Sequence, residues 1–259
     1  MSDFILPERI GSILKITLNR PDKYNSFVRE MALAFQEQLE KAREDTAIRC
    51  VLLTGNGKAF CAGQDLREAI DPEGPELTKI VSEHYNPIIK QLRELPKPVV
   101  VAVNGVAAGA GANIALAGDV VLAAESASFI QAFSKIGLIP DSGGTYTLPR
   151  LIGYQKASAL MMLGDKISAT DAEKMGMIYR VVSDTSLAEE SLKIAQTLSQ
   201  MPTKALAYTK ELLNHSPLNT LEQQLAEEDH FQTLAGKSYD YEEGVKAFLE
   251  KRKPEFRGE

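Results

Sequence analysis

The sequence predicts an α/β domain built on a largely parallel sheet, followed by a region of helices alone. Short apolar runs recur to about Val182, and the segments between them have helical periodicity. From Ser186 onward only helical signals remain, interrupted by prolines. With 259 residues, 44% of them hydrophobic, the chain can bury the core of one large domain.

A βαβ unit opens this alternation. Residues 13–18 (ILKITL) indicate a strand, and turn residues follow at 19–23. An amphipathic helix, capped near Asn25 or Ser26, is predicted by apolar side chains at every fourth position, which are Phe27, Met31, Phe35 and Leu39. Residues 50–54 (CVLLT) are apolar throughout, as expected of a parallel strand covered on both faces.

The same alternation continues downstream. Residues 75–95 have helical spacing, and the prolines at 96–98 end that helix. Residues 99–103 are the next buried strand, and a run of small residues leads into a short helix. Residues 119–123 (DVVLA) add a further strand.

Composition narrows the range of functions. The formal net charge of −6 offers no general attraction to nucleic acid or to an anionic membrane. The two cysteines lack CxxC spacing and the histidines are scattered, so neither a zinc site nor a disulfide framework is expected. Residues 1–10 do not show the basic region followed by an apolar region that is typical of a signal peptide, and no apolar stretch is long enough to span a bilayer. We therefore expect a cytoplasmic protein without a metal.

Two glycine-bearing loops, residues 60–65 and 104–111, follow apolar strands and point to one site at the strands' carboxyl ends. Ile114 stands where a dinucleotide fingerprint needs glycine or alanine, and no P-loop motif occurs. A small-residue helix start does expose backbone N–H groups that can bind an oxyanion. The alternative is that these glycines only allow close packing of the helix on the sheet.

Several motifs occur in a fixed order along nearly the whole chain. They are residues 18–21 (LNRP) with Lys23 and Asn25, 60–66 (FCAGQDL), 97–105 (KPVVVAVNG) with Gly109, and 137–145 (GLIPDSGGT). This set resembles the successive motifs of the crotonase, or enoyl-CoA hydratase/isomerase, superfamily. The ending 248–256 (FLEKRKPEF) is similar to the C-terminal helix of that family.

The resemblance implies a spiral of ββα turns over residues 1–195 and a helical, trimerising region over 196–259. It also implies an acyl-coenzyme A substrate, no separate cofactor, and a homotrimer or a dimer of trimers. The oxyanion hole maps onto the backbone N–H groups of Gln64 and Ala110. The expected coenzyme A contacts are Lys23, Asn25, Ala62, Asp65 and Leu66, with Phe248 and Lys251 from a neighbouring or the same subunit.

The catalytic glutamates of the hydratases are missing at the matching positions, which hold Asn113 and Phe133. A phenyl ring cannot take a proton or orient water, so hydration is not expected. Asp141 is the remaining candidate acid/base, because the matching position faces the acyl pocket in relatives. Its alternative role is to cap the helix that runs toward Leu151. Asn113 could contact substrate or be a satisfied amide on a helix face.

Residues 137–153 most resemble the phenylacetate-pathway isomerases, which convert ring-1,2-epoxyphenylacetyl-CoA into oxepin-CoA. We expect Asp141 to move a proton while Gln64 and Ala110 hold the enolate oxygen, and Phe133 to keep the pocket dry. The alternatives are a Δ3,Δ2-enoyl-CoA isomerase or hydratase-like enzyme of fatty-acid oxidation, a dehalogenase with a nucleophilic aspartate, and a non-catalytic acyl-CoA-binding or RNA-binding protein. The acidic balance of the chain argues against RNA.

Overall fold

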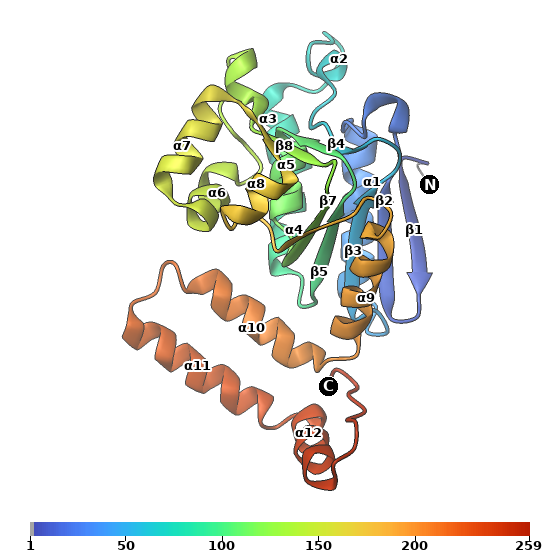
Figure 1. Ribbon diagram of the computed structural model, residues 1–259, viewed down its shortest axis with the longest axis vertical. Helices are drawn as coiled ribbons and strands as arrows, with labels where there is room; N and C mark the ends of the chain where they lie inside the picture. Colours follow the sequence, from blue (N-terminus) through green and yellow to red (C-terminus); the bar gives the residue numbers. More distant parts are fainter. Residues whose placement is uncertain (1–2) are drawn as a thin grey trace.

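The computed structural model describes residues 3–259 and contains two β-sheets surrounded by helices (Figure 1). The first two residues of the N-terminal segment, which is expected to carry no targeting signal, lie outside the described residues. The larger sheet has the strand order β1(Ile5–Ile10), β2(Ile13–Leu18), β3(Cys50–Gly55), β5(Val99–Val103), β7(Val120–Ala124), β10(Arg180–Val182). The smaller sheet has the order β4(Ala59–Cys61), β6(Val106–Ala108), β8(Ser128–Ile130), β9(Lys166–Ser168).

Successive strands alternate between the two sheets. β3, β5 and β7 lie in the larger sheet, and the strands that follow them directly, β4, β6 and β8, lie in the smaller one. Within each sheet, neighbouring strands are parallel, except for the antiparallel pairs β1–β2 and β8–β9. Each pair leads into helical structure, so the predicted spiral of ββα turns is confirmed. The helical segments that follow the three pairs are α2(Leu66–Ala69), α5(Ala110–Leu116), and η3(Ala132–Ile136) with α6(Gly144–Ile152).

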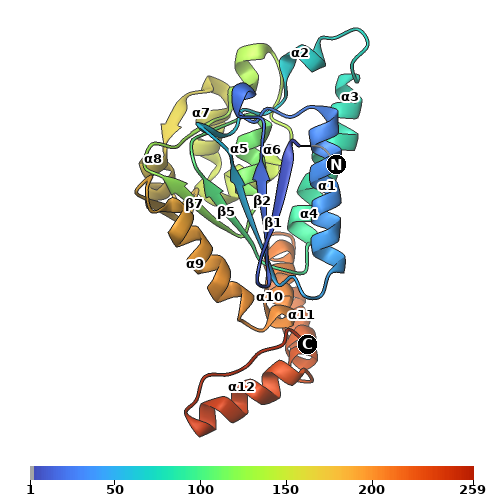
Figure 2. The ribbon, with the colours of Figure 1, turned by 90° about the vertical axis from the view of Figure 1, so that its right-hand side faces the viewer.

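Helices cover both faces of the larger sheet (Figure 2). α1(Arg29–Glu44) and α4(Asn86–Glu94) lie on one side, and α9(Leu187–Ser199) lies on the other. Strand β5 is buried at every position, which explains its uninterrupted apolar sequence. The remaining short elements are η1(Pro21–Lys23), α3(Leu77–Lys79), the π-helix η2(Ile80–Tyr85), α7(Tyr154–Leu163) and α8(Ala169–Lys174).

Strand β1 was not predicted. It pairs with β2 through a hairpin in which Ile10 faces Ile13 across the two-residue turn Gly11-Ser12. Gly11 has a φ of +58°, which such a tight turn requires. The exposed, proline-containing sequence of β1 hides its strand character, but the Gly-Ser turn before an apolar run was an available signal.

The start of the first helix differs from the prediction. α1 begins at Arg29 with Val28 as its N-cap, and Phe27 instead forms a parallel bridge with Gln64. The prediction that Asn25 or Ser26 caps this helix is therefore wrong. The Asn25 side chain instead connects two loops. It accepts a hydrogen bond from the backbone N–H of Arg20 and donates to two carbonyl oxygens of the 56–59 segment.

Three C-terminal helices extend away from the sheets (Figure 1). They are α10(Thr203–His215), α11(Leu221–Ala235) and α12(Tyr239–Glu250). The predicted domain boundary at residue 195 falls inside α9, which packs on the larger sheet. The helices that extend away from the sheets begin only at α10. The division into two domains remains a prediction.

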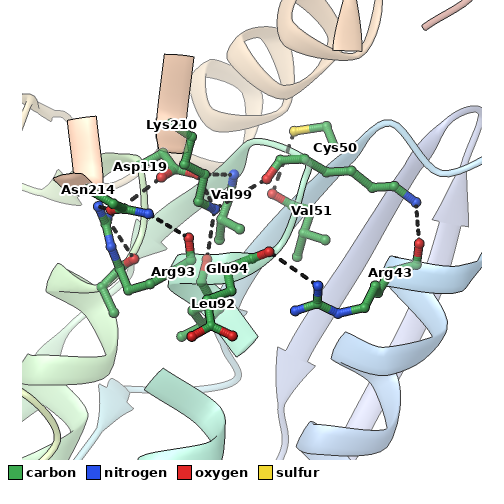
Figure 3. A network of polar contacts seen from close by, with 12 residues as sticks. Arg43, Cys50, Val51, Leu92, Arg93, Glu94, Val99, Asp119, Lys210 and Asn214 are labelled. Atoms are coloured by element: carbon green, nitrogen blue, oxygen red, sulfur yellow. Dashed lines mark hydrogen bonds and ion pairs between the residues drawn. The ribbon is translucent and has the colours of Figure 1, made fainter. Parts of the chain in front are cut away.

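Helix α10 is attached to the core by a buried polar network (Figure 3). The Lys210 ammonium donates to the Asp119 carboxylate at 2.8 Å and to the carbonyl oxygen of Leu92 at 2.7 Å. Asn214 donates to the carbonyl oxygen of Arg93 at 3.0 Å. Side chains of α10 thus satisfy carbonyls at the C-terminal end of α4, which have no partner within their own helix.

Candidate active site

The loop after β4 presents the first predicted oxyanion donor. The backbone N–H of Phe27 donates to the carbonyl oxygen of Gly63 at 2.7 Å, and the N–H of Asp65 donates to the carbonyl oxygen of Phe27 at 2.8 Å. In a parallel bridge of this kind the N–H of the intervening residue points away from its partner. The Gln64 N–H is therefore directed away from Phe27.

The second donor lies at the start of α5. Gly109 has φ +54° and ψ −128°, a conformation that glycine alone adopts readily, and this turn leaves Ala110 as the first helical residue. The two loops touch, because a Cβ atom placed on Gly63 would lie 3.3 Å from the Ala110 backbone nitrogen. The structure therefore brings the Gln64 and Ala110 segments together.

Neither backbone N–H donates a hydrogen bond to another group within residues 3–259. For Ala110 this follows from its place in the first turn of a helix, where no preceding carbonyl is available. Two adjacent donors without a partner suit an oxygen that gains negative charge. Their role as an oxyanion hole remains a prediction.

Asp141 follows η3 and precedes α6 in the chain. Its main-chain carbonyl oxygen accepts two hydrogen bonds, from the Gly144 N–H at 2.9 Å and from the Asn113 side-chain Nδ2 at 2.8 Å. The carboxylate accepts from the Ser142 hydroxyl at 2.8 Å. Gly143, not Asp141, is the N-cap of α6, and that helix has no side-chain cap. The alternative role of Asp141 as a helix cap is therefore wrong.

Asn113 connects Asp141 to the oxyanion loop. It lies three residues after Ala110, on the same side of α5. Its Oδ1 accepts a hydrogen bond from the Gln131 side chain at 2.8 Å while its Nδ2 donates to Asp141. Of the two roles left open for Asn113, the structure favours the satisfied amide. Gln131 was not predicted, and its Oε1 is buried without a partner in the described structure.

Burial sets the protonation behaviour of the site. Desolvation raises the pKa of the Asp141 carboxyl, and the hydrogen bond from Ser142 opposes this effect only in part. Tyr85 is fully buried, and desolvation raises the pKa of its hydroxyl well above the usual range, with the nearby carboxylates of Asp141 and Glu68 acting in the same direction. Asp141 and Tyr85 thus belong to one electrostatic environment.

Phe133 lies beside the oxyanion loop. Its ring is 3.7 Å from the position that a Cβ on Gly109 would occupy, and only 6% of the residue is exposed. It therefore excludes water from the neighbourhood of Ala110, as expected of an apolar side chain in place of a hydratase glutamate.

The predicted coenzyme A contacts fall into three groups. Lys23 and Ala62 are neighbours, because the Ala62 N–H donates to the carbonyl oxygen of Tyr24, and Leu66 begins α2 four residues after Ala62. Asp65 is paired with Arg20 at 3.0 Å and caps α2, and the side chain of Asn25 is fully buried and used within the loops. Both thus have structural roles, and their contact with coenzyme A remains a prediction.

Phe248 and Lys251 form the third group, at the end of α12. Figures 1 and 2 show α12 and α2 at opposite ends of the molecule. This separation favours contact from a neighbouring copy over contact from the same subunit, and the contact itself remains a prediction. Phe248 is 82% exposed, as a contact with a second copy requires.

Two further expectations concern metals and membranes. Within residues 3–259 the structure has no group of three or more His, Cys, Asp or Glu side chains that could hold a metal ion. No helix in this part of the chain is both long and apolar enough to cross a bilayer.

Comparison with known proteins shows the family of the chain. The family model for enoyl-CoA hydratase/isomerase matches residues 8–259. The chain is 50% identical to the 1,2-epoxyphenylacetyl-CoA isomerase of Escherichia coli (strain K12), with both chains covered completely. It is 34% identical to the 2,3-dehydroadipyl-CoA hydratase of the same organism, again over the full length of both.

Solved structures give the same result for the fold. An enoyl-CoA hydratase from Bacillus anthracis superposes with a TM-score of 0.92 at 34% identity, covering 99% of this chain and 100% of the other. An enoyl-CoA hydratase from Polaromonas sp. JS666 has a TM-score of 0.90 at 37% identity, covering 97% and 99%.

Proposed function

Since the chain belongs to the enoyl-CoA hydratase/isomerase family, we propose that it is an acyl-CoA isomerase that converts ring-1,2-epoxyphenylacetyl-CoA into oxepin-CoA. The family is enzymatic, and the full-length relative at 50% identity is an isomerase with this substrate in its name. The observation that carries the proposal is the half-buried Asp141, whose main-chain carbonyl oxygen is linked through Asn113 to the helix that begins at Ala110.

The reaction moves one proton within one substrate and breaks the ring carbon–carbon bond that the epoxide oxygen spans, whose electrons pass into the double bonds of the seven-membered ring. Asp141 takes a proton near the acyl α or γ carbon, the negative charge passes to the thioester oxygen, and the proton returns at another carbon. The Gln64 and Ala110 N–H groups stabilise that oxygen. The composition of the substrate does not change, so neither water nor a second carboxylate is required.

Binding requires no cofactor besides the coenzyme A moiety of the substrate. Lys23, Ala62 and Leu66 contact that moiety within one subunit. Phe248 and Lys251 of a neighbouring copy complete the site, in a homotrimer or a dimer of trimers. Exposed apolar side chains on the three C-terminal helices support such an assembly, among them Leu213, Leu221, Leu225, Val245 and Leu249. The enzyme acts in the cytoplasm.

A Δ3,Δ2-enoyl-CoA isomerase is the second candidate. The same Asp141 and the same two N–H groups serve the shift of a double bond in a linear acyl chain. The Phe133 ring beside Gly109 offers an aromatic surface for packing, which favours a ring over a long chain.

Parallel assays separate these candidates. The enzyme is incubated with ring-1,2-epoxyphenylacetyl-CoA, with a linear 3-enoyl-CoA and with crotonyl-CoA, and the thioester products are resolved by chromatography. We expect the highest kcat/KM for the epoxide. Faster conversion of the 3-enoyl thioester would favour the second candidate, and hydration of crotonyl-CoA as the main activity would contradict both. Binding without any turnover would indicate a non-catalytic protein.

A further inference from the structure

We propose that Tyr85 and Glu68 are positioning residues that hold the side chain of Gln64 and thereby orient its backbone N–H toward the thioester oxygen. The inference rests on the proposed function, because it concerns the oxyanion hole of the same site. Neither residue touches the reacting atoms in this arrangement.

The Gln64 amide is held at both ends. Its Nε2 donates to the Glu68 carboxylate at 2.8 Å, and its Oε1 accepts from the Tyr85 hydroxyl at 3.0 Å. Because an ionised carboxylate can only accept, the NH2 end of the amide must face Glu68 and the oxygen must face Tyr85. Tyr85 therefore acts as the donor, and the orientation of the amide is fixed.

Both anchors are attached to rigid elements. The second carboxylate oxygen of Glu68 accepts from the backbone N–H of Arg29 at 2.9 Å, at the start of α1, where the helix dipole stabilises a negative charge. Tyr85 is the last residue of the π-helix η2, and its ring packs against Phe27 with centroids 6.0 Å apart. A single π-helical turn inside a longer helix is often found at a functional site.

An oxyanion donor works only if its direction is set before the reaction. The bridge to Phe27 fixes the residues on either side of Gln64, but the Gln64 N–H itself has no bond within residues 3–259. The contacts of the side chain hold Gln64 itself in place, and with it the planar peptide that carries the N–H. Preorganisation of this kind is the main source of catalysis by hydrogen-bond donors, where the loss of one donor costs about 100- to 1,000-fold in rate.

Burial raises the pKa of the Tyr85 hydroxyl well above the usual range, so the hydroxyl carries the proton that it donates to Gln64 at neutral and acid pH. Its contribution is therefore independent of pH, in contrast with that of Asp141. A variant at Tyr85 should lower kcat without moving the pH profile.

Polarisation of the thioester provides a direct test. Phenylacetyl-CoA labelled with 13C at the carbonyl is bound to the wild type and to Tyr85→Phe, and the carbonyl stretching band is measured by difference infrared spectroscopy. We expect the band to move to lower wavenumber on binding to the wild type and to move less in Tyr85→Phe. With the epoxide as substrate, kcat should fall about tenfold in the variant, part of the effect of losing a donor, with KM within about twofold.

A double variant shows whether Tyr85 acts through the side chain of Gln64. In Gln64→Ala, which keeps the backbone N–H, adding Tyr85→Phe should change neither the band nor kcat further. Glu68→Ala, at a half-exposed position, should reproduce the effect of Tyr85→Phe if the latter folds poorly. Tyr179→Phe, at an exposed tyrosine, is the matched control and should behave as the wild type.

The inference is overturned if Tyr85→Phe leaves the bound carbonyl band where the wild type has it, or if its effect is as large in the Gln64→Ala background as in the wild type. A band that does not move on binding to the wild type would overturn the oxyanion hole itself, and this inference with it. If the carbonyl band shifts as expected on binding to the wild type but the epoxide is not isomerised, the proposed function alone would be contradicted.

Discussion

The side-chain Nδ2 of Asn113 donates a hydrogen bond to the main-chain carbonyl oxygen of Asp141 at 2.8 Å. Asn113 stands where the hydratases of the family carry a catalytic glutamate, and here the position supports the neighbouring loop. Gly144 packs directly against this amide, so a side chain at 144 would displace it. The amide at this position thus holds the main chain of Asp141, the residue proposed as the base.

Asn113→Ala should lower kcat about tenfold while KM for the thioester changes little. The Asp141 carbonyl would keep only its bond to the Gly144 N–H, and the carboxylate would lose part of its fixed position, which costs rate because reacting groups must be aligned. Steady-state kinetics with the epoxide measure the effect. An unchanged kcat would mean that Asn113 does not position the base.

The approach of the two glycine-bearing loops could be predicted from the sequence. Gln64, Ala110 and Asp141 lie in loops that follow strands, and the carboxyl ends of parallel strands converge. Gln131 and Tyr85 could not be predicted, because each acts through one hydrogen bond to a residue 18 or 21 positions away in the chain. Strand β1 and the start of α1 were missed because contacts with other segments outweigh their local sequence preference.

The pH dependence of kcat/KM should reflect Asp141. The base is active when ionised, and burial raises its pKa, so activity should fall on acidification at a pH above the value of about 4 that is usual for an aspartate. Initial rates between neutral and mildly acid pH, with folding followed by circular dichroism, measure this. A rate that stays constant until the protein unfolds would contradict the assignment.

Asp141→Asn should melt at a higher temperature than the wild type at pH 7. Because the folded-state pKa is raised, the folded protein binds the proton more tightly than the unfolded chain, and the ionised carboxylate costs stability at neutral pH. That cost is absent below the unfolded pKa, so the difference should shrink as the pH approaches about 4. Thermal unfolding at several pH values tests this, and a lower melting temperature at pH 7 would be the opposite result.

Gly109→Ala should lower both stability and kcat. At φ +54° and ψ −128° a side chain strains the backbone by about 1–3 kcal/mol, and the strain would be relieved by moving the start of α5. Gly11→Ala is the matched control, since Gly11 also has positive φ but lies in a surface turn with open space around it. Its kcat should be that of the wild type. Equal losses of kcat in the two variants would show that the Gly109 effect is not specific to the site.

The most direct test of the central claim is the turnover of ring-1,2-epoxyphenylacetyl-CoA by Asp141→Asn, with thioester binding measured by calorimetry on the same protein. Loss of an acid/base group predicts that kcat falls about 100- to 10,000-fold while the Kd for phenylacetyl-CoA is unchanged. Asp165→Asn, at an exposed aspartate, should retain full activity. Formation of oxepin-CoA by Asp141→Asn within a few fold of the wild-type rate would contradict the claim.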